Sequence, residues 1–203
     1  MVSNVPTTTE FEPHLVGDYR EHPPRLRPLL ALWDTSRDWL LWRLEGVTDD
    51  EWLWEPGPRA WTVRPVGERW QRDSGRDRDP TDTVRTIAWL AGHLGEAGLL
   101  RADWTTGSHS REPDAVEWPG TAAHGIDFLR TGLDAWRDAL GQLSDEELDV
   151  VGRSAYPWGL DPQLPILDIA WWNTRELIHH GADISVVRDL YRQLSRSAGE
   201  SSP

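Results

Sequence analysis

The stretch IAWWNTRELIHHGADISVV, residues 169–187, decides the fold. At 100° per residue, Ile169, Glu176, His180 and Val187 fall within about 40° of one another on a helix. Ile169 and Val187 are apolar and should face a core, so Glu176 and His180 point inward on the same face. A buried carboxylate is costly unless it is paired or bound to a cation. The stretch therefore predicts a core helix, from about residue 165 to 194, that carries a polar site.

Three other stretches have apolar residues at helical spacing, over about 24–47, from 81 or 83 to 102, and 120–143. The links between helices are long, and the one between the second and third covers residues 103–118. Helices joined by such long links are typical of bundles in which the chain crosses from one end to the other. The sequence thus predicts an all-α fold, a four-helix bundle with long crossover connections.

The remaining segments lack helical periodicity. Residues 1–22 are expected to form an N-terminal arm, 23–194 the bundle, and 195–203 a disordered tail. The link at 53–80 is expected to lie over the bundle, with a short hairpin near residues 60–70.

Composition limits the classes of function. The chain has 203 residues, no Cys and a formal net charge of −13. The acidic charge argues against binding nucleic acid or an anionic membrane surface. No apolar run approaches the length of a membrane span, and the N-terminal residues do not resemble a secretory signal. The expected location is the cytoplasm, and any metal must be held by His, Asp or Glu.

The inward pair Glu176 and His180 needs a partner, and His93 is the candidate. It lies at the border of the apolar stripe of the second helix. Two His and one carboxylate form a known set of ligands for a divalent metal, with positions left open for water or substrate. The alternatives are a hydrogen-bonded core histidine at position 93 and an ordinary helical ion pair between Glu176 and His180.

Four neighbours of this set are candidate substrate-binding residues. Asn173 lies one turn before Glu176 and could hydrogen-bond a ligand, and Asp183 lies one turn after His180 and could orient a ligand or a base. Trp89 and Trp172 flank the set and could form walls of a pocket, although core packing is the alternative for both. The sequence identifies no general base.

Two segments resemble a known family. TIAWLAGHL (86–94) and NTRELIHHGADI (173–184) are similar to the second- and fourth-helix motifs of the DinB-like superfamily. The resemblance implies a four-helix bundle with a three-His metal site, one His on helix two and an His-x-x-x-His pair on helix four. His93 and His180 match two of these positions. Glu176 stands where the first His of the pair is usual, so Zn, Ni, Fe and Mn are not distinguished.

The resemblance also implies a class of reaction. Family members include metal-dependent transferases and isomerases that use a low-molecular-weight thiol such as mycothiol or bacillithiol. The absence of Lys beside abundant Arg and 14 Trp is typical of an actinobacterial source, which favours mycothiol. The expected partner is a small-molecule substrate, and both a monomer and a homodimer remain open. The alternatives are a non-catalytic binding or stress protein with a vestigial site, and a mononuclear metal hydrolase or oxygenase.

Overall fold

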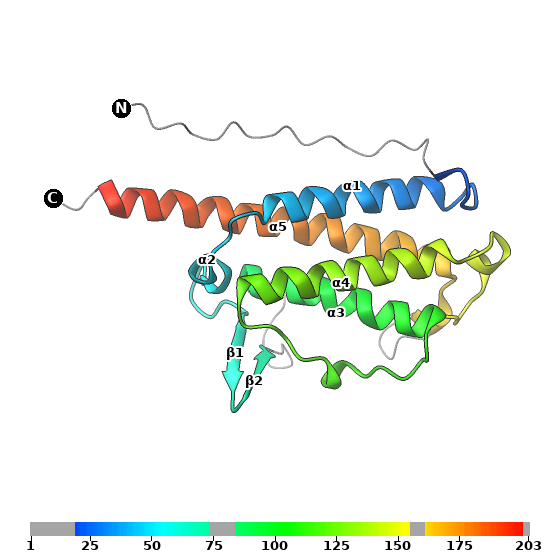
Figure 1. Ribbon diagram of the computed structural model, residues 1–203, viewed down its shortest axis with the longest axis horizontal. Helices are drawn as coiled ribbons and strands as arrows, with labels where there is room; N and C mark the ends of the chain where they lie inside the picture. Colours follow the sequence, from blue (N-terminus) through cyan, green and yellow to red (C-terminus); the bar gives the residue numbers. More distant parts are fainter. Residues whose placement is uncertain (1–18, 74–83, 155–160, 201–203) are drawn as a thin grey trace.

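A computed structural model describes residues 19–73, 84–154 and 161–200. Four long helices form the body of the molecule (Figure 1). They are α1 (Arg27–Arg43), α3 (Ile87–Thr106), α4 (Ala122–Gly141) and α5 (Ile166–Glu200). The predicted all-α four-helix bundle is confirmed.

The directions of the helices explain the long links. The colour gradient in Figure 1 shows α3 and α4 running in the same direction, opposite to α1 and α5. Parallel neighbours cannot be joined by a tight turn, so the segment 107–121 returns along the bundle before α4 begins (Figure 1). This crossover contains one 3-10 helix, η2 (Pro113–Ala115).

Glycines allow α3 and α4 to pack with their backbones in contact. A Cβ atom added to Gly98 would lie 2.2 Å from the carbonyl oxygen of Gly132. A Cβ atom added to Gly132 would lie 2.1 Å from the carbonyl oxygen of Gly95. No larger residue fits these positions unless the two helices separate.

The described part of the link between α1 and α3 has secondary structure of its own. It contains α2 (Asp49–Leu53) and an antiparallel hairpin of β1 (Val63–Val66) and β2 (Arg69–Arg72). Gly67 has φ +63° in the turn, a backbone conformation that glycine adopts without steric cost. The hairpin predicted near residues 60–70 is therefore present, and it extends to Arg72.

The start of α3 differs from the prediction. Thr86 is extended and its Oγ1 accepts a hydrogen bond from the backbone N–H of Trp89 at 3.2 Å, so it caps the helix. Arg85 pairs with Trp61 as an isolated bridge, which holds the residues just before Thr86 out of a helix. Residues 81 and 83, where the start was predicted, lie outside the described residues, but residues 84–86 are not helical, so the helix that begins at Ile87 starts later than predicted.

The C-terminal end of the chain differs from the prediction. α5 continues to Glu200, so the predicted disordered tail at 195–203 is wrong for residues 195–200. A formed helix propagates by one hydrogen bond per added residue, and no Pro interrupts it before residue 203. Residues 201–203, and residues 1–18 of the predicted arm, lie outside the described residues.

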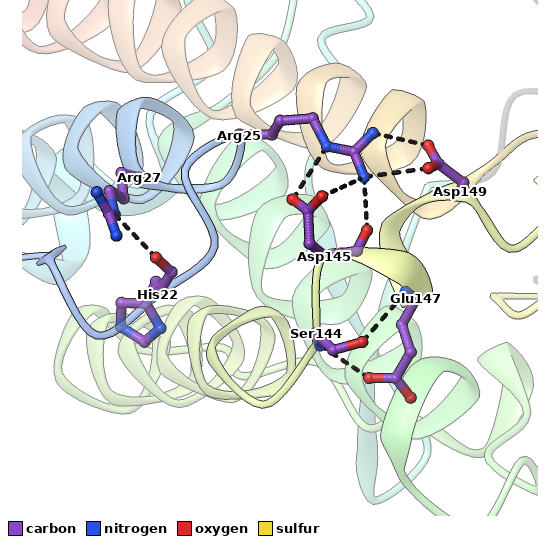
Figure 2. A network of polar contacts seen from close by, with 7 residues as sticks. All are labelled: His22, Arg25, Arg27, Ser144, Asp145, Glu147 and Asp149. Atoms are coloured by element: carbon purple, nitrogen blue, oxygen red, sulfur yellow. Dashed lines mark hydrogen bonds and ion pairs between the residues drawn. The ribbon is translucent and has the colours of Figure 1, made fainter.

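A polar network connects the chain entering α1 to the segment after α4 (Figure 2). The guanidinium of Arg25 contacts the carboxylates of Asp145 and Asp149. Ser144 and Glu147 form a reciprocal capping box, in which the backbone N–H of each donates to the side chain of the other. The 3-10 helices η3 (Glu146–Asp149) and η4 (Asp161–Gln163) lie on the way to α5.

A buried ion pair fastens α5 to α2. Arg188 and Glu51 are almost fully buried, and their Nε and Oε1 atoms lie 2.9 Å apart. Arg188 also donates to the carbonyl oxygen of Glu45 at 2.6 Å. The pair holds α5 at a fixed position along the bundle.

The core is built from Leu, Ile and large aromatic side chains of the four long helices, and α2 and the hairpin segment add further members. Its largest fully buried members include Trp33, Trp52 and Trp136. Within the described ranges, the helices are all too short or too polar to cross a membrane.

Candidate metal centre

Three side chains from two helices converge on one side of the bundle. His93 comes from α3, and Glu176 and His180 come from α5; one ligand atom of each lies within 4.8 Å of the others. His180 Nε2 is 3.2 Å from Glu176 Oε2. The rings of His93 and His180 lie edge to face, with their centroids 5.2 Å apart. The structure thus brings together the three predicted residues.

The ring of Trp89 packs against the ring of His93 and holds it in place. The two rings are stacked, with their centroids 5.3 Å apart and their planes at an angle of only 16°. Trp89 is itself fixed, because its Nε1–H donates to the carbonyl oxygen of Asp73 at 3.1 Å and its ring packs against Trp61. Trp89 therefore supports the imidazole of His93 and does not line the cavity described below.

The protonation states of His93 and Glu176 are those in which these groups bind a metal ion. Burial, together with the neighbouring His180, lowers the pKa of His93 to about 3. The hydrogen bond from His180 lowers the pKa of Glu176 to about 2. At neutral pH the chain therefore presents a neutral imidazole at position 93 and a carboxylate at position 176, the forms in which these groups bind a cation.

Asp183 lies on the outer side of His180. Its Oδ2 is 3.4 Å from Nδ1 of His180, whereas Nε2 of the same ring faces Glu176. Metal-binding histidines commonly donate their second ring N–H to a carboxylate, which fixes the tautomer and the ring orientation. The position of Asp183 matches this arrangement.

The spacing of the three groups can be compared with that of a metal site. Bonds of about 2.0–2.2 Å to N and O ligands put tetrahedral ligand atoms roughly 3.4 Å apart. The 3.2 Å between His180 and Glu176 matches this distance. The other two spacings, His93 to Glu176 and His93 to His180, are both within 4.8 Å and need a closure of at most about 1.4 Å, which small rotations of these three side chains can supply. The donor set therefore fits a divalent cation.

A cavity of about 160 Å³ adjoins the three residues. Its wall includes Asn173, which is 5% exposed and whose Nδ2 has no hydrogen-bond partner among the described residues. Trp172 also lines it, with the guanidinium of Arg175 stacked 3.9 Å above its ring. The described residues that line the cavity are Arg72, His93, Leu94, Glu96, Ala97, Arg101, Trp172, Asn173 and Glu176.

Three charged residues of this wall were not foreseen. Glu96 is 2% exposed, and its carboxylate contacts Arg72 at 3.1 Å and accepts from Trp118 Nε1 at 3.1 Å. Burial raises the pKa of Glu96. Arg101 is 7% exposed. Glu96 could have been found from the sequence, because it is a carboxylate three residues after His93 inside an otherwise apolar stretch. Arg72 could not, because it lies in a link without periodicity.

Comparison with known proteins places the chain in a family. The sequence model of the DinB superfamily matches residues 32–184. The chain belongs to the DinB superfamily. All three converging residues of this DinB superfamily member lie within the matched segment, and together with its membership they indicate a divalent metal of undetermined identity. No curated protein and no solved structure matches the sequence.

Proposed function

We propose that this DinB superfamily protein is a divalent-metal-dependent enzyme, a transferase or isomerase that uses a low-molecular-weight thiol such as mycothiol. His93, Glu176 and His180 would hold the cation. The observation that carries the proposal is the convergence of these three ligand atoms within 4.8 Å at the wall of a cavity.

A divalent cation with open coordination positions lowers the pKa of a bound thiol or water, which makes a nucleophile at neutral pH. Three protein ligands leave such positions open. Since the chain has no Cys, the thiol would be supplied by a bound small molecule.

The surrounding residues have separate roles in this proposal. Asp183 holds His180 with Nε2 directed at the centre, and Trp89 keeps the ring of His93 in position. The unpartnered amide of Asn173 donates a hydrogen bond to the substrate, and the indole of Trp172 forms one wall of its cavity. None of these groups is placed to be assigned as the general base.

A second candidate is a non-catalytic protein. The carboxylate of Glu176 already contacts His180 at 3.2 Å and Arg175 at 3.1 Å, which satisfies its charge without a cation. In that case the three residues form a structural ion-pair cluster, and the cavity is not an active site.

The two candidates differ in a direct assay. Metal-stripped protein is mixed with mycothiol and an electrophile such as monobromobimane, and thiol consumption is followed with and without added Zn²⁺, Ni²⁺, Fe²⁺ or Mn²⁺. The enzyme candidate requires metal-dependent consumption that His93→Ala abolishes. Metal binding without consumption of thiol would refute the proposed reaction class and leave hydrolytic or oxygenase chemistry for the same ligands.

A further inference from the structure

We propose that the cavity beside the metal centre selects a substrate with an anionic end, a carboxylate or a phosphate, which is held by Arg101, Arg72 and the amide of Asn173. This inference rests on the proposed function for its metal. It adds the chemical class of the ligand and the residues that determine specificity.

The charges of the residues that line the cavity favour an anionic ligand. Arg72 and Arg101 each contribute one positive charge, and Glu96 and Glu176 each contribute one negative charge. Among the described residues that line the cavity these four charges cancel, so a bound divalent cation adds two positive charges to this part of the wall. A small, partly enclosed space with such an excess favours an anionic ligand over its neutral analogue.

The arrangement along α3 gives the second step. His93, Ala97 and Arg101 recur every four residues on one face of the helix, and all three line the cavity. Eight residues of helix separate His93 from Arg101 by about 12 Å along the axis. Ala97 has only a methyl group and leaves the space between them open. The ligand is therefore elongated, with its metal-binding atom near His93 and its anionic end toward Arg101.

The unpartnered amide of Asn173 gives the third step. A buried donor without a partner is costly, and in native structures such a group usually has a partner that completes it. Asn173 lies on α5 opposite this part of α3 and lines the same cavity. An anionic oxygen in the cavity would accept from its Nδ2 as well as from a guanidinium.

The test uses metal-loaded full-length protein and a series of thiols. The ω-mercaptocarboxylates with two to six carbons are compared with their uncharged amides by calorimetric titration, and inorganic phosphate is added as a competitor. We expect the best carboxylate to bind at least about tenfold more tightly than its amide. Displacement by millimolar phosphate would assign the site to phosphate esters; no displacement would assign it to carboxylates.

Variants separate a specific site from general charge attraction. Arg101→Gln should reduce the carboxylate preference to within about threefold, whereas Arg43→Gln, a matched change at an arginine paired with Asp189 elsewhere on the molecule, should leave it unchanged. Glu96→Gln should strengthen carboxylate binding, because it removes a negative charge and releases Arg72; a gain of this kind cannot result from misfolding.

Metal content is measured for every variant, so that a failure of the metal centre is distinguished from a failure of this inference. Equal affinities for carboxylate and amide in wild-type protein that carries its metal would overturn the inference and leave the metal centre intact. A carboxylate preference that survives Arg101→Gln and is unchanged by Glu96→Gln would overturn it as well.

Discussion

The buried pair between Glu51 and Arg188 provides a sharp test of the packing of α5. In Glu51→Gln the guanidinium of Arg188 stays buried but loses its counter-charge. Removal of one member of a buried ion pair destabilises proteins by about 3–5 kcal/mol, chiefly because the remaining charge is left uncompensated. Arg188 keeps its hydrogen bond to Glu45, and glutamine keeps an acceptor oxygen, so we expect the lower end, about 3 kcal/mol.

Urea unfolding followed by tryptophan fluorescence measures this change. With an m-value of about 2 kcal/mol/M, the midpoint should fall by roughly 1.5 M. The control is Asp149→Asn, which removes a partner of Arg25 in the exposed network of Figure 2 and should cost less than about 1 kcal/mol. The double variant Glu51→Leu, Arg188→Leu should recover most of the loss, because neither charge then remains buried. Equal small effects of Glu51→Gln and Asp149→Asn would refute the reasoning.

Three further outcomes follow from the structure. Gly98→Ala should lower the free energy of unfolding in urea by about 1–2 kcal/mol, because the added Cβ meets the backbone of Gly132 and this outweighs the better helix propensity of alanine. Gly181→Ala should be neutral or stabilising, because a Cβ there makes only ordinary contacts, the nearest at 3.9 Å. In metal-free protein, the free energy of unfolding should fall as the pH drops from about 6.5 to 3, because in this range His93 is protonated in the unfolded chain but, with its pKa of about 3, not in the folded one. In His93→Gln this fall should be shallower, and a pH profile identical to that of wild type would contradict the buried, neutral state of His93. Asp183→Asn should weaken metal affinity by about 10–100-fold with little change in metal-free stability, and unchanged affinity would exclude the orienting role of Asp183.

Periodicity was enough to predict the bundle and the residues that converge. Glu176 and His180 share a face with Ile169 and Val187, and this constraint follows from helix geometry alone. Ile169 is buried and Val187 nearly so, so their face does point to the core, with Glu176 and His180 at its partly exposed edge. His93 was chosen because it lies at the border of the apolar stripe of the second helix, and the superfamily motif then matched the same residue.

The rest of the site depends on contacts that no local pattern encodes. Arg72 reaches Glu96 only because the hairpin of β1 and β2 lies beside α3. The start of α3 was placed too early because the cap at Thr86 competes with earlier threonines of equal propensity, and tertiary pairing of Arg85 decides between them. The extension of α5 to Glu200 was missed because a polar composition resembles that of a disordered tail even where a helix continues.

The metal content of untagged protein tests the central claim most directly. Elemental analysis of wild type is set beside His93→Ala, Glu176→Ala and His180→Ala, each purified in the same way and dialysed against the same divalent cations. The proposed centre requires close to one cation per wild-type chain and a large loss in each variant. An equal, low content in all four proteins would contradict it, and the cluster of His93, Glu176 and His180 would then be an ion pair of the bundle and nothing more.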